Sequence, residues 1–174
     1  MKFKTAWEGT EMDIDFDGRV GLLTDFMPGT FFVTRDEQRT IFGISAMHSD
    51  DPMAILFNLA INPSDPFPSL VPAKFLEAMR LIGLMGAYLV PSLSQSAMEF
   101  SSTQQDGPGS LILTEDTMFM RVARTDGFFY FDVNTGLIVV SSPSGIEIPR
   151  WSVRLPERGG SALKLFEFDG PNPF

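Results

Sequence analysis

The sequence contains no cysteine, and this absence excludes several kinds of site at once. The 174-residue chain can form no internal disulfide bond, thiolate zinc site or iron–sulfur cluster, and it has no cysteine nucleophile. Histidine occurs once, as His48, so a metal site with two histidine ligands from this chain is also excluded. A glycine-rich phosphate loop is missing too, because GPGS at 107–110 lacks the lysine that such a loop needs. We therefore expect no cofactor.

Basic residues are scarce. Lysine and arginine number 13 against 22 aspartates and glutamates, which gives a formal charge of −9 at neutral pH. Such a field repels phosphate backbones, so nucleic acid is not an expected partner. A protein partner or a second copy of the chain, in a homo-oligomer, is the expected kind of contact.

Long apolar runs are missing as well. The longest, at 81–90, is half of the roughly 20 residues that cross a bilayer as a helix. The N-terminal stretch MKFKTAWEGTEM has two lysines but no apolar core behind them, unlike a signal peptide. We therefore expect a soluble protein without membrane insertion, located in the cytoplasm or associated with a particle.

Tyrosine is rare, whereas phenylalanine is abundant. Phenylalanine occurs 17 times and tyrosine twice, in a chain that is 44% hydrophobic. A phenylalanine ring has no polar tip and is stabilised by full burial, while adaptable binding surfaces favour tyrosine. The bias indicates a large dry core or a hydrophobic subunit interface.

Several segments show the pattern of a β-strand. Residues 11–17, EMDIDFD, place apolar side chains on one face and aspartates on the other, which predicts a half-buried strand. Residues 30–46 predict two strands around a polar turn at 36–38. Residues 53–61, MAILFNLAI, are compatible with a strand or with a short buried helix, and the strands before them favour a strand.

One segment, 72–90, has the character of a helix. Pro72 suits the first helical turn, an apolar stripe follows, and Pro91 would stop the helix. From Leu81 onward the segment is apolar all round, so its second half should be enclosed. Gly83 and Gly86 cost about 1 kcal/mol each in a helix, and close approach of a neighbour would compensate for this cost.

Strand signals return after a polar loop at 92–110. We predict a single domain, 1–174, of the α+β class, mostly antiparallel β with about ten strands and one central buried helix near 72–90. The alternative is a duplicated β-sandwich or a pair of barrel-like halves. In that alternative, weak pseudo-halves at 1–70 and 110–174 would be joined by the helix and the loop.

The motif DIDFDG matches the opening of a calcium-binding loop. Asp13, Asp15 and Asp17 alternate before a glycine, as the first ligands of such a loop do. The twelfth position is Thr24, where the loop requires a bidentate acid. A strand whose aspartate face meets water is the favoured alternative, and the three aspartates are retained as a candidate metal site.

Catalytic patterns are weak. His48 precedes two aspartates in MHSDDP, but no G-x-S-x-G elbow accompanies it, so an exposed turn is favoured over a catalytic role or a metal-ligand role. Paired carboxylates can run a hydrolase, yet 22 acids single out no pair. The candidates are Asp13, Asp15, Asp17, Asp25, Glu99, Glu115 and Asp116. We assign no catalytic residue.

The stretch PRWSVRLPER has the composition of an interface. Arg150 and Arg154 share one strand face with Ser152, and Trp151 lies on the other face. Arginine and tryptophan are the residue types that dominate binding energy at protein interfaces. The alternative is a core tryptophan beneath a solvated arginine face. The candidate interface residues are Phe128, Tyr130, Arg150, Trp151 and Arg154.

The run TDGFFYFDVNTGLIVVSSPSG predicts a β-hairpin. Its three-residue loop would be 134–136, with Gly136 in the left-handed conformation and Val133 opposite Leu137. Both faces of this hairpin are apolar, so both need cover. The core would cover one face, and the helix or a second chain would cover the other.

These observations favour a non-enzymatic binding or assembly module that acts through protein–protein contacts. Self-association, as an accessory or virion-type structural subunit, fits the apolar strand faces and the phenylalanine excess. The alternative is a small acid-based hydrolase or a small-ligand-binding protein, with a pocket under the loop at 92–110.

Overall fold

The computed structural model describes residues 2–7, 10–15, 18–36, 39–58, 68–93, 107–157 and 160–170, the first two ranges as backbone. Strands dominate these ranges. Those of the first half are β1 (Lys2–Trp7), β2 (Thr10–Asp15), β3 (Gly18–Gly21), β4 (Phe31–Arg35), β5 (Thr40–His48), β6 (Asp51–Leu56), β7 (Ser69–Pro72), β8 (Leu81–Leu84) and β9 (Tyr88–Pro91). Those of the second half are β10 (Leu111–Leu113), β11 (Met118–Arg124), β12 (Gly127–Asp132), β13 (Ile138–Val139), β14 (Ile146–Ile148), β15 (Trp151–Pro156) and β16 (Ala162–Phe168). Two 3₁₀ turns accompany them, η1 (Leu23–Asp25) and η2 (Ala73–Leu76).

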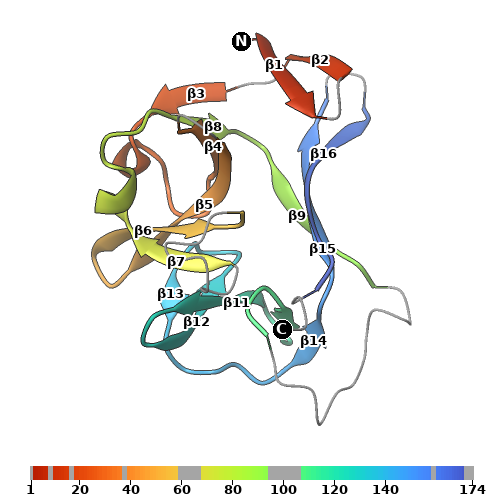
Figure 1. The fold of residues 1–174 in the computed structure, drawn as a ribbon. Helices are drawn as coiled ribbons and strands as arrows, with labels where there is room; N and C mark the ends of the chain where they lie inside the picture. Colours follow the sequence, from red (N-terminus) through yellow and green to blue (C-terminus); the bar gives the residue numbers. More distant parts are fainter. Residues whose placement is uncertain are drawn as a thin grey trace.

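The strands form three sheets (Figure 1). β1 and β2 pair with each other. The large sheet has the order β13-β12-β11-β7-β6-β5-β4-β8-β3, with β10 beside β11 and β14 beside β10. The third sheet has the order β16-β15-β9. Among the described strands, neighbours run antiparallel except β11 and β7, which meet at one parallel pair, Ala123 with Ser69.

The chain passes between the large sheet and the three-stranded sheet through short connections. Residues 85–87 join β8 to β9, and residues 149–150 join β14 to β15. Figure 1 shows β9, β15 and β16 side by side on the right, opposite the curled large sheet on the left. The two sheets therefore enclose a space that their inner side chains fill.

Aromatic side chains fill the space between the two sheets. The Phe57 ring lies 5.3 Å from the Trp151 ring between centroids, and the Phe42 ring lies 5.7 Å from the Phe166 ring. Trp151 also stacks on Phe168, at 5.3 Å. Much of the phenylalanine of this sequence is thus used in the core, which explains the excess over tyrosine.

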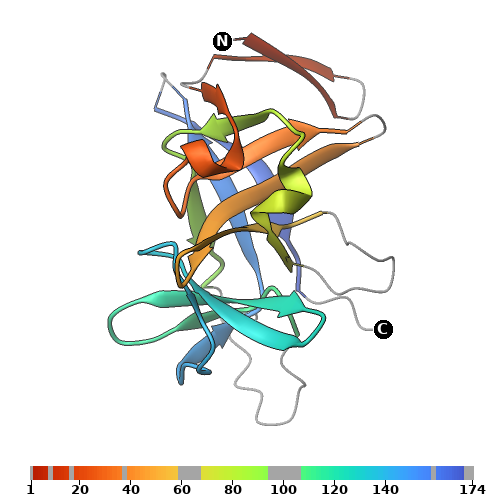
Figure 2. The same ribbon diagram turned by 90° about the vertical axis from the view of Figure 1, so that its left-hand side faces the viewer.

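A second, smaller core lies on another face of the large sheet. Leu23 of η1, Phe26 and Leu76 of η2 cover buried side chains of the strands there. Figure 2 shows η1 and η2 in front of the strands of the large sheet. Because both faces of these strands are covered, they read as nearly continuous apolar runs in the sequence.

The predicted central helix at 72–90 is wrong. Residues 73–76 form only the 3₁₀ turn η2, and β8 and β9 follow. Gly86 has a φ of +81°, which a right-handed helix does not allow. At Gly83, an added Cβ would lie 2.5 Å from the Phe26 ring. The glycine is therefore needed because the Phe26 ring packs directly against the backbone of β8. Among the described residues there is no α-helix.

Other parts of the fold prediction are confirmed or corrected. The chain is mostly antiparallel β, and the two strands predicted within 30–46 are β4 and β5. The ambiguous segment 53–61 begins as strand β6, while its end lies outside the described residues. The described residues contain sixteen strands, where about ten were predicted for the chain. The large sheet curls but does not close into a barrel in the part of the chain described, and the single domain with pseudo-halves at 1–70 and 110–174 stays a prediction.

Candidate functional site

The outer face of the β9–β15–β16 sheet carries the two arginines singled out in the sequence. β15 is the central strand, and Ser152 lies opposite Val90 on one side and Glu167 on the other. Because side chains alternate along a strand, these three share one face with Arg154, while Trp151 takes the opposite face. The pairing of three strands thus gathers residues from distant parts of the chain on one surface.

Trp151 lies on the inner face and is 2% exposed. Its indole Nε1–H donates a 2.6 Å hydrogen bond to the backbone carbonyl oxygen of Gly109. Its ring packs against Phe57 and Phe168. The tryptophan belongs to the core, as in the alternative interpretation of the sequence, so its arginine neighbours are the surface candidates of this stretch.

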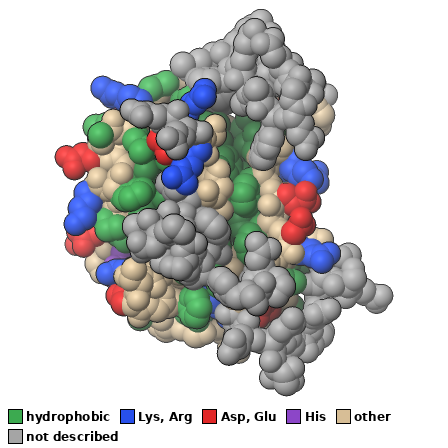
Figure 3. Space-filling view, in the orientation of Figure 1, with side chains coloured by type: hydrophobic (Ala, Val, Ile, Leu, Met, Phe, Trp, Pro, Cys, Tyr) green, Lys and Arg blue, Asp and Glu red, His purple; other side chains and the backbone are tan. Residues whose placement is uncertain are grey.

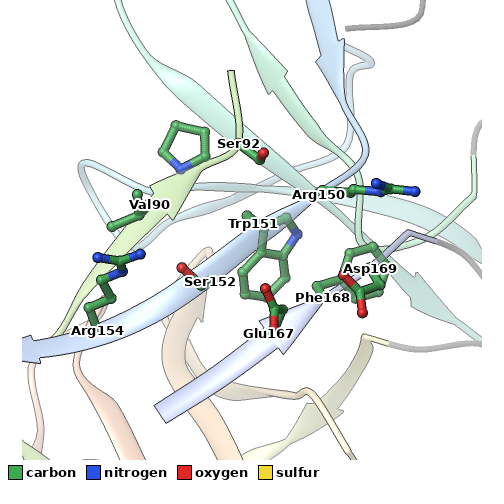
Figure 4. A pocket seen from close by; sticks show the side chains of 10 residues that line it. Val90, Ser92, Arg150, Trp151, Ser152, Arg154, Glu167, Phe168 and Asp169 are labelled. Atoms are coloured by element: carbon green, nitrogen blue, oxygen red, sulfur yellow. The ribbon is translucent and has the colours of Figure 1, made fainter. Parts of the chain in front are cut away.

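A pocket of about 370 Å³ opens on the outer face (Figure 4). Val90 and Ser92 line it from β9 and the residues that follow, and Glu167 and Asp169 line it from β16 and beyond. Ser152 lies between them on β15. Polar and charged side chains therefore form most of the lining that is open to solvent.

Arg150 and Arg154 lie at opposite ends of this pocket (Figure 4). Both side chains are exposed, and neither guanidinium forms an ion pair or a hydrogen bond with any residue that the structure describes. Glu167, by contrast, is engaged by Lys164. Figure 3 shows basic and acidic side chains next to one another on the right, over β15 and β16. Within the described part of the chain, no acid competes with an external carboxylate for the two arginines.

Ser152 is a polar side chain that is 7% exposed. Its hydroxyl forms no hydrogen bond with the described residues, and solvent reaches it, because no buried side-chain oxygen or nitrogen of the described residues lacks a partner. Because Ser152 lines the pocket, a solvent molecule or a ligand there can pair with it. Sequence reasoning placed Ser152 on the arginine face but missed it as a site residue. The signal was a small polar residue between two arginines at alternating positions.

The loop at 92–110 begins and ends next to this site. Its first residue, Ser92, donates a backbone hydrogen bond of 2.9 Å to the carbonyl oxygen of Arg150. Near its other end, Gly109 accepts the hydrogen bond from the Trp151 indole. The predicted pocket under this loop coincides with the observed pocket only at Ser92, because residues 94–106 lie outside the described part.

Phe128 and Tyr130 are not brought together with Arg150 and Arg154. They lie on β12 in the large sheet, whereas Arg154 lies on β15 of the three-stranded sheet and Arg150 directly precedes that strand. Tyr130 is 8% exposed, beneath the Arg121 guanidinium at 5.9 Å from the ring centroid. Phe128 is 47% exposed. Their role as interface residues stays a prediction, and it concerns a different surface.

The aromatic hairpin has a different register from the predicted one. Phe131 pairs with Ile138, and Asp132 N–H donates to the carbonyl oxygen of Leu137. The loop is therefore one residue longer, and Ile138 rather than Leu137 turns to the core. Gly136 has the predicted left-handed conformation, with a φ of +74°. Its position against Pro28 leaves no room for a Cβ.

The calcium site at Asp13, Asp15 and Asp17 stays a prediction. Asp13 and Asp15 lie in β2, of which only the backbone is described, and Asp17 lies outside the described residues. The extended backbone agrees with the strand expected for this stretch. In the described part of the chain, no group of three or more carboxylate, histidine or cysteine side chains is arranged to hold a metal ion.

The remaining catalytic candidates are scattered. His48 ends β5 at a tight turn before Asp51, and its ring lies edge-on to Phe129 at 5.7 Å. Asp25 accepts a hydrogen bond from the backbone N–H of Leu22 in the first turn of η1. Glu115 and Asp116 are exposed between β10 and β11, and Glu99 lies outside the described residues.

Comparison with known proteins gives no family for this chain. Among the helical segments described, none is long and apolar enough to cross a membrane. No family model, no curated protein and no solved structure matches the chain.

Proposed function

We propose that this protein is a non-enzymatic binding module that contacts another protein chain through the outer face of the β9–β15–β16 sheet. The proposal rests on the exposed guanidinium groups of Arg150 and Arg154, which flank a pocket and have no acidic partner among the described residues. Arginine is one of the residues that contribute most binding energy at protein interfaces. On a chain with a formal charge of −9, such a spot selects for acidic partners.

The lining of the pocket favours a protein partner over a small apolar ligand. Small-molecule sites are enclosed mostly by hydrophobic and aromatic side chains, with few polar groups. Here Trp151 and Phe168 are buried beneath the surface, and charged side chains surround Ser152. A polar surface with free arginines is typical of a contact that is formed and released.

The same surroundings argue against nucleophilic catalysis by Ser152. An activated serine needs a general base within hydrogen-bond distance of its hydroxyl. The Ser152 hydroxyl has no hydrogen-bond partner in the described ranges, and Glu167, which lies across from it on β16, is engaged by Lys164. A recognition role needs no such activation.

The proposal includes self-assembly. Exposed acids stand at Asp50, in the turn after β5, at Asp51, which begins β6, and at Glu115 and Asp116, between β10 and β11. A contact between the arginine face of one copy and an acidic turn of the next would be heterologous, so it would build rings or filaments. Such growth fits an accessory or virion-type structural subunit.

Charge reversal tests this proposal. The double variant Arg150→Glu/Arg154→Glu is compared with the wild type and with Arg19→Glu/Arg35→Glu, which makes the same charge change at exposed arginines of β3 and β4. Light scattering at rising protein concentration measures self-association. Affinity capture from the organism that makes the protein, with all three proteins as bait, identifies other partners.

The expected result is an assembly or a partner that the wild type and the control retain and that the Arg150/Arg154 variant loses. An identical oligomeric state and identical captured proteins for all three would refute the proposal. Circular dichroism of each variant verifies that its fold is kept.

A small-ligand-binding function is the second candidate. It is favoured by the pocket volume of about 370 Å³, which lies within the range of known ligand sites, and by the start of the 92–110 loop at its edge. A metabolite that raises the melting temperature of the wild type but not of Ser152→Val would support this function.

A further inference from the structure

The Ser152 hydroxyl indicates which kind of chemical group binds at this surface. The residue is 7% exposed, its hydroxyl has no hydrogen-bond partner among the described residues and is open to the pocket, and it lies between two arginines. A hydroxyl in this position can donate a hydrogen bond to an acceptor that enters the pocket. We propose that the pocket is an oxyanion site that takes carboxylate groups from an extended acidic segment of a partner protein. This inference rests on the proposed function.

The positions of the two arginines define the spacing of the acidic groups. Arg150 and Arg154 are four residues apart, which is roughly 13 Å along an extended strand. Figure 4 shows their guanidinium groups on opposite sides of Ser152. An extended segment with acids at alternating positions presents its first and third carboxylates at the same spacing. Each arginine can then bind one carboxylate through two parallel hydrogen bonds, and the middle carboxylate lies over Ser152.

The charges on this face favour carboxylate over phosphate. Among the described residues, Arg150, Arg154 and Lys164 face Glu167 and Asp169, so these five side chains have a net charge of only +1. The chain as a whole has a formal charge of −9. A phosphate group with a charge near −2 is repelled more strongly by this background than a carboxylate with a charge of −1.

A titration with matched peptides tests the inference. The probe is the blocked peptide acetyl-Glu-Ser-Glu-Ser-Glu-amide, and its neutral control has glutamine in place of each glutamate. Nuclear magnetic resonance spectra of the ¹⁵N-labelled full-length protein follow the backbone amides. With the acidic peptide, shifts are expected at residues 90, 92, 150–154 and 167–169, and the apparent affinity should fall as salt is added. The glutamine peptide should cause no comparable shifts.

Three variants locate the binding groups. Arg150→Gln/Arg154→Gln should weaken binding of the acidic peptide by about tenfold or more, because two charge-assisted contacts are lost. Ser152→Ala should weaken it by roughly tenfold, the effect of losing one hydrogen bond to a charged acceptor. Arg19→Gln/Arg35→Gln, with the same loss of charge away from the pocket, should bind like the wild type. The arginine side chains are exposed, so replacing them should leave the fold unchanged. The arginine variants therefore test the inference even if Ser152→Ala alters packing.

Each outcome decides the inference. Equal shifts with the glutamine peptide, shifts that persist in Arg150→Gln/Arg154→Gln, or shifts confined to other surfaces would overturn it. Inorganic phosphate that binds at these amides more tightly than the acidic peptide would overturn the assignment to carboxylate. If the acidic peptide binds here but charge reversal changes neither assembly nor captured partners, the site stands and the proposed function fails. If charge reversal removes a partner while the peptide does not bind, the proposed function stands and this inference fails.

Discussion

The indole of Trp151 and the backbone carbonyl of Gly109 are joined by a 2.6 Å hydrogen bond in the interior of the protein. The carbonyl belongs to the end of the 92–110 loop, and the tryptophan belongs to the central strand of the three-stranded sheet. On the other side of the same strand segment, Ser92 donates a hydrogen bond to the carbonyl oxygen of Arg150. The two ends of the loop are therefore attached to neighbouring residues of one segment.

Replacing Trp151 with phenylalanine should lower the free energy of unfolding by about 2–3 kcal/mol. The variant loses the hydrogen bond, leaves the Gly109 carbonyl without its donor and opens a small cavity beside Phe57. Urea denaturation followed by circular dichroism measures the change. Tyr88→Phe is the control, because Tyr88 is 43% exposed and should change stability by less than about 0.5 kcal/mol. Equal stabilities for the two variants would contradict the role assigned to Trp151.

Gly109→Ala should destabilise the protein by about 3 kcal/mol, and Gly86→Ala by about 1 kcal/mol. Both glycines have a left-handed φ, of +96° and +81°. A Cβ at Gly109 would lie 2.1 Å from the ring of Phe168, whereas a Cβ at Gly86 meets nothing within 4 Å. Thermal or chemical unfolding gives the loss of free energy of unfolding for each variant. The difference between the two losses is the steric cost of the contact with Phe168. A Gly109→Ala variant no less stable than Gly86→Ala would show that Phe168 can move aside.

Asp132→Ala should destabilise the aromatic hairpin by about 1–2 kcal/mol. The Asp132 Oδ1 atom accepts hydrogen bonds from the backbone N–H of Asn134 at 2.8 Å and from the Thr117 hydroxyl at 3.0 Å. Asp132→Asn keeps an acceptor oxygen and should recover most of the loss. Asp126→Ala removes only a partly exposed ion pair with Arg124 and should cost less than about 0.5 kcal/mol. Hydrogen exchange at β12 and β13 would report where the loss occurs.

Arg121→Met should lower stability by about 2 kcal/mol, while Arg124→Met should change it by less than about 1 kcal/mol. Both arginines stand on β11 and pair with an acid. The Arg121 side chain is 5% exposed and lies against Glu147 at 3.3 Å, so its removal leaves a partly buried carboxylate without that cation. The Arg124 side chain is 37% exposed, and water can replace its contact with Asp126. Denaturant titrations of both variants give the comparison, and a larger loss at Arg124 would reverse the expected order.

Local patterns predicted the elements whose signals lie within a few residues. The segment 30–46 has two apolar runs and one polar turn, and it forms β4 and β5 as expected. Gly136 has the backbone conformation that a glycine in a hairpin loop predicts. These predictions succeed because the turn residues and the strands they join are neighbours in the chain.

The helix prediction failed because an apolar run does not reveal what pairs with it. Residues 81–84 are enclosed on both faces, and β8 pairs with β3 on one side and with β4 on the other. An enclosed strand and an enclosed helix have the same composition over so short a length. The glycines Gly83 and Gly86 were the contrary signal, since both are unfavourable in a helix.

The candidate site was predicted only in part, because a local pattern does not show which strands pair with one another. Alternation along β15 placed the arginines and Ser152 on one face, as the structure does. Val90 was assigned to the helix and Glu167 to no site, because strand pairing between 88–91, 151–156 and 162–168 is not encoded in any local window. Burial of Ser152 follows from its neighbours on both adjacent strands, which only the fold brings together.

The two short connections between the sheets have a consequence for unfolding. β14 and β15 are separated by Pro149 and Arg150 alone, and β8 and β9 by residues 85–87. Neither sheet can therefore detach without pulling strands out of the other, and both lose the aromatic core when they part. We therefore expect the large sheet and the three-stranded sheet to open as one cooperative unit, so that native-state hydrogen exchange gives their central strands the same opening free energy.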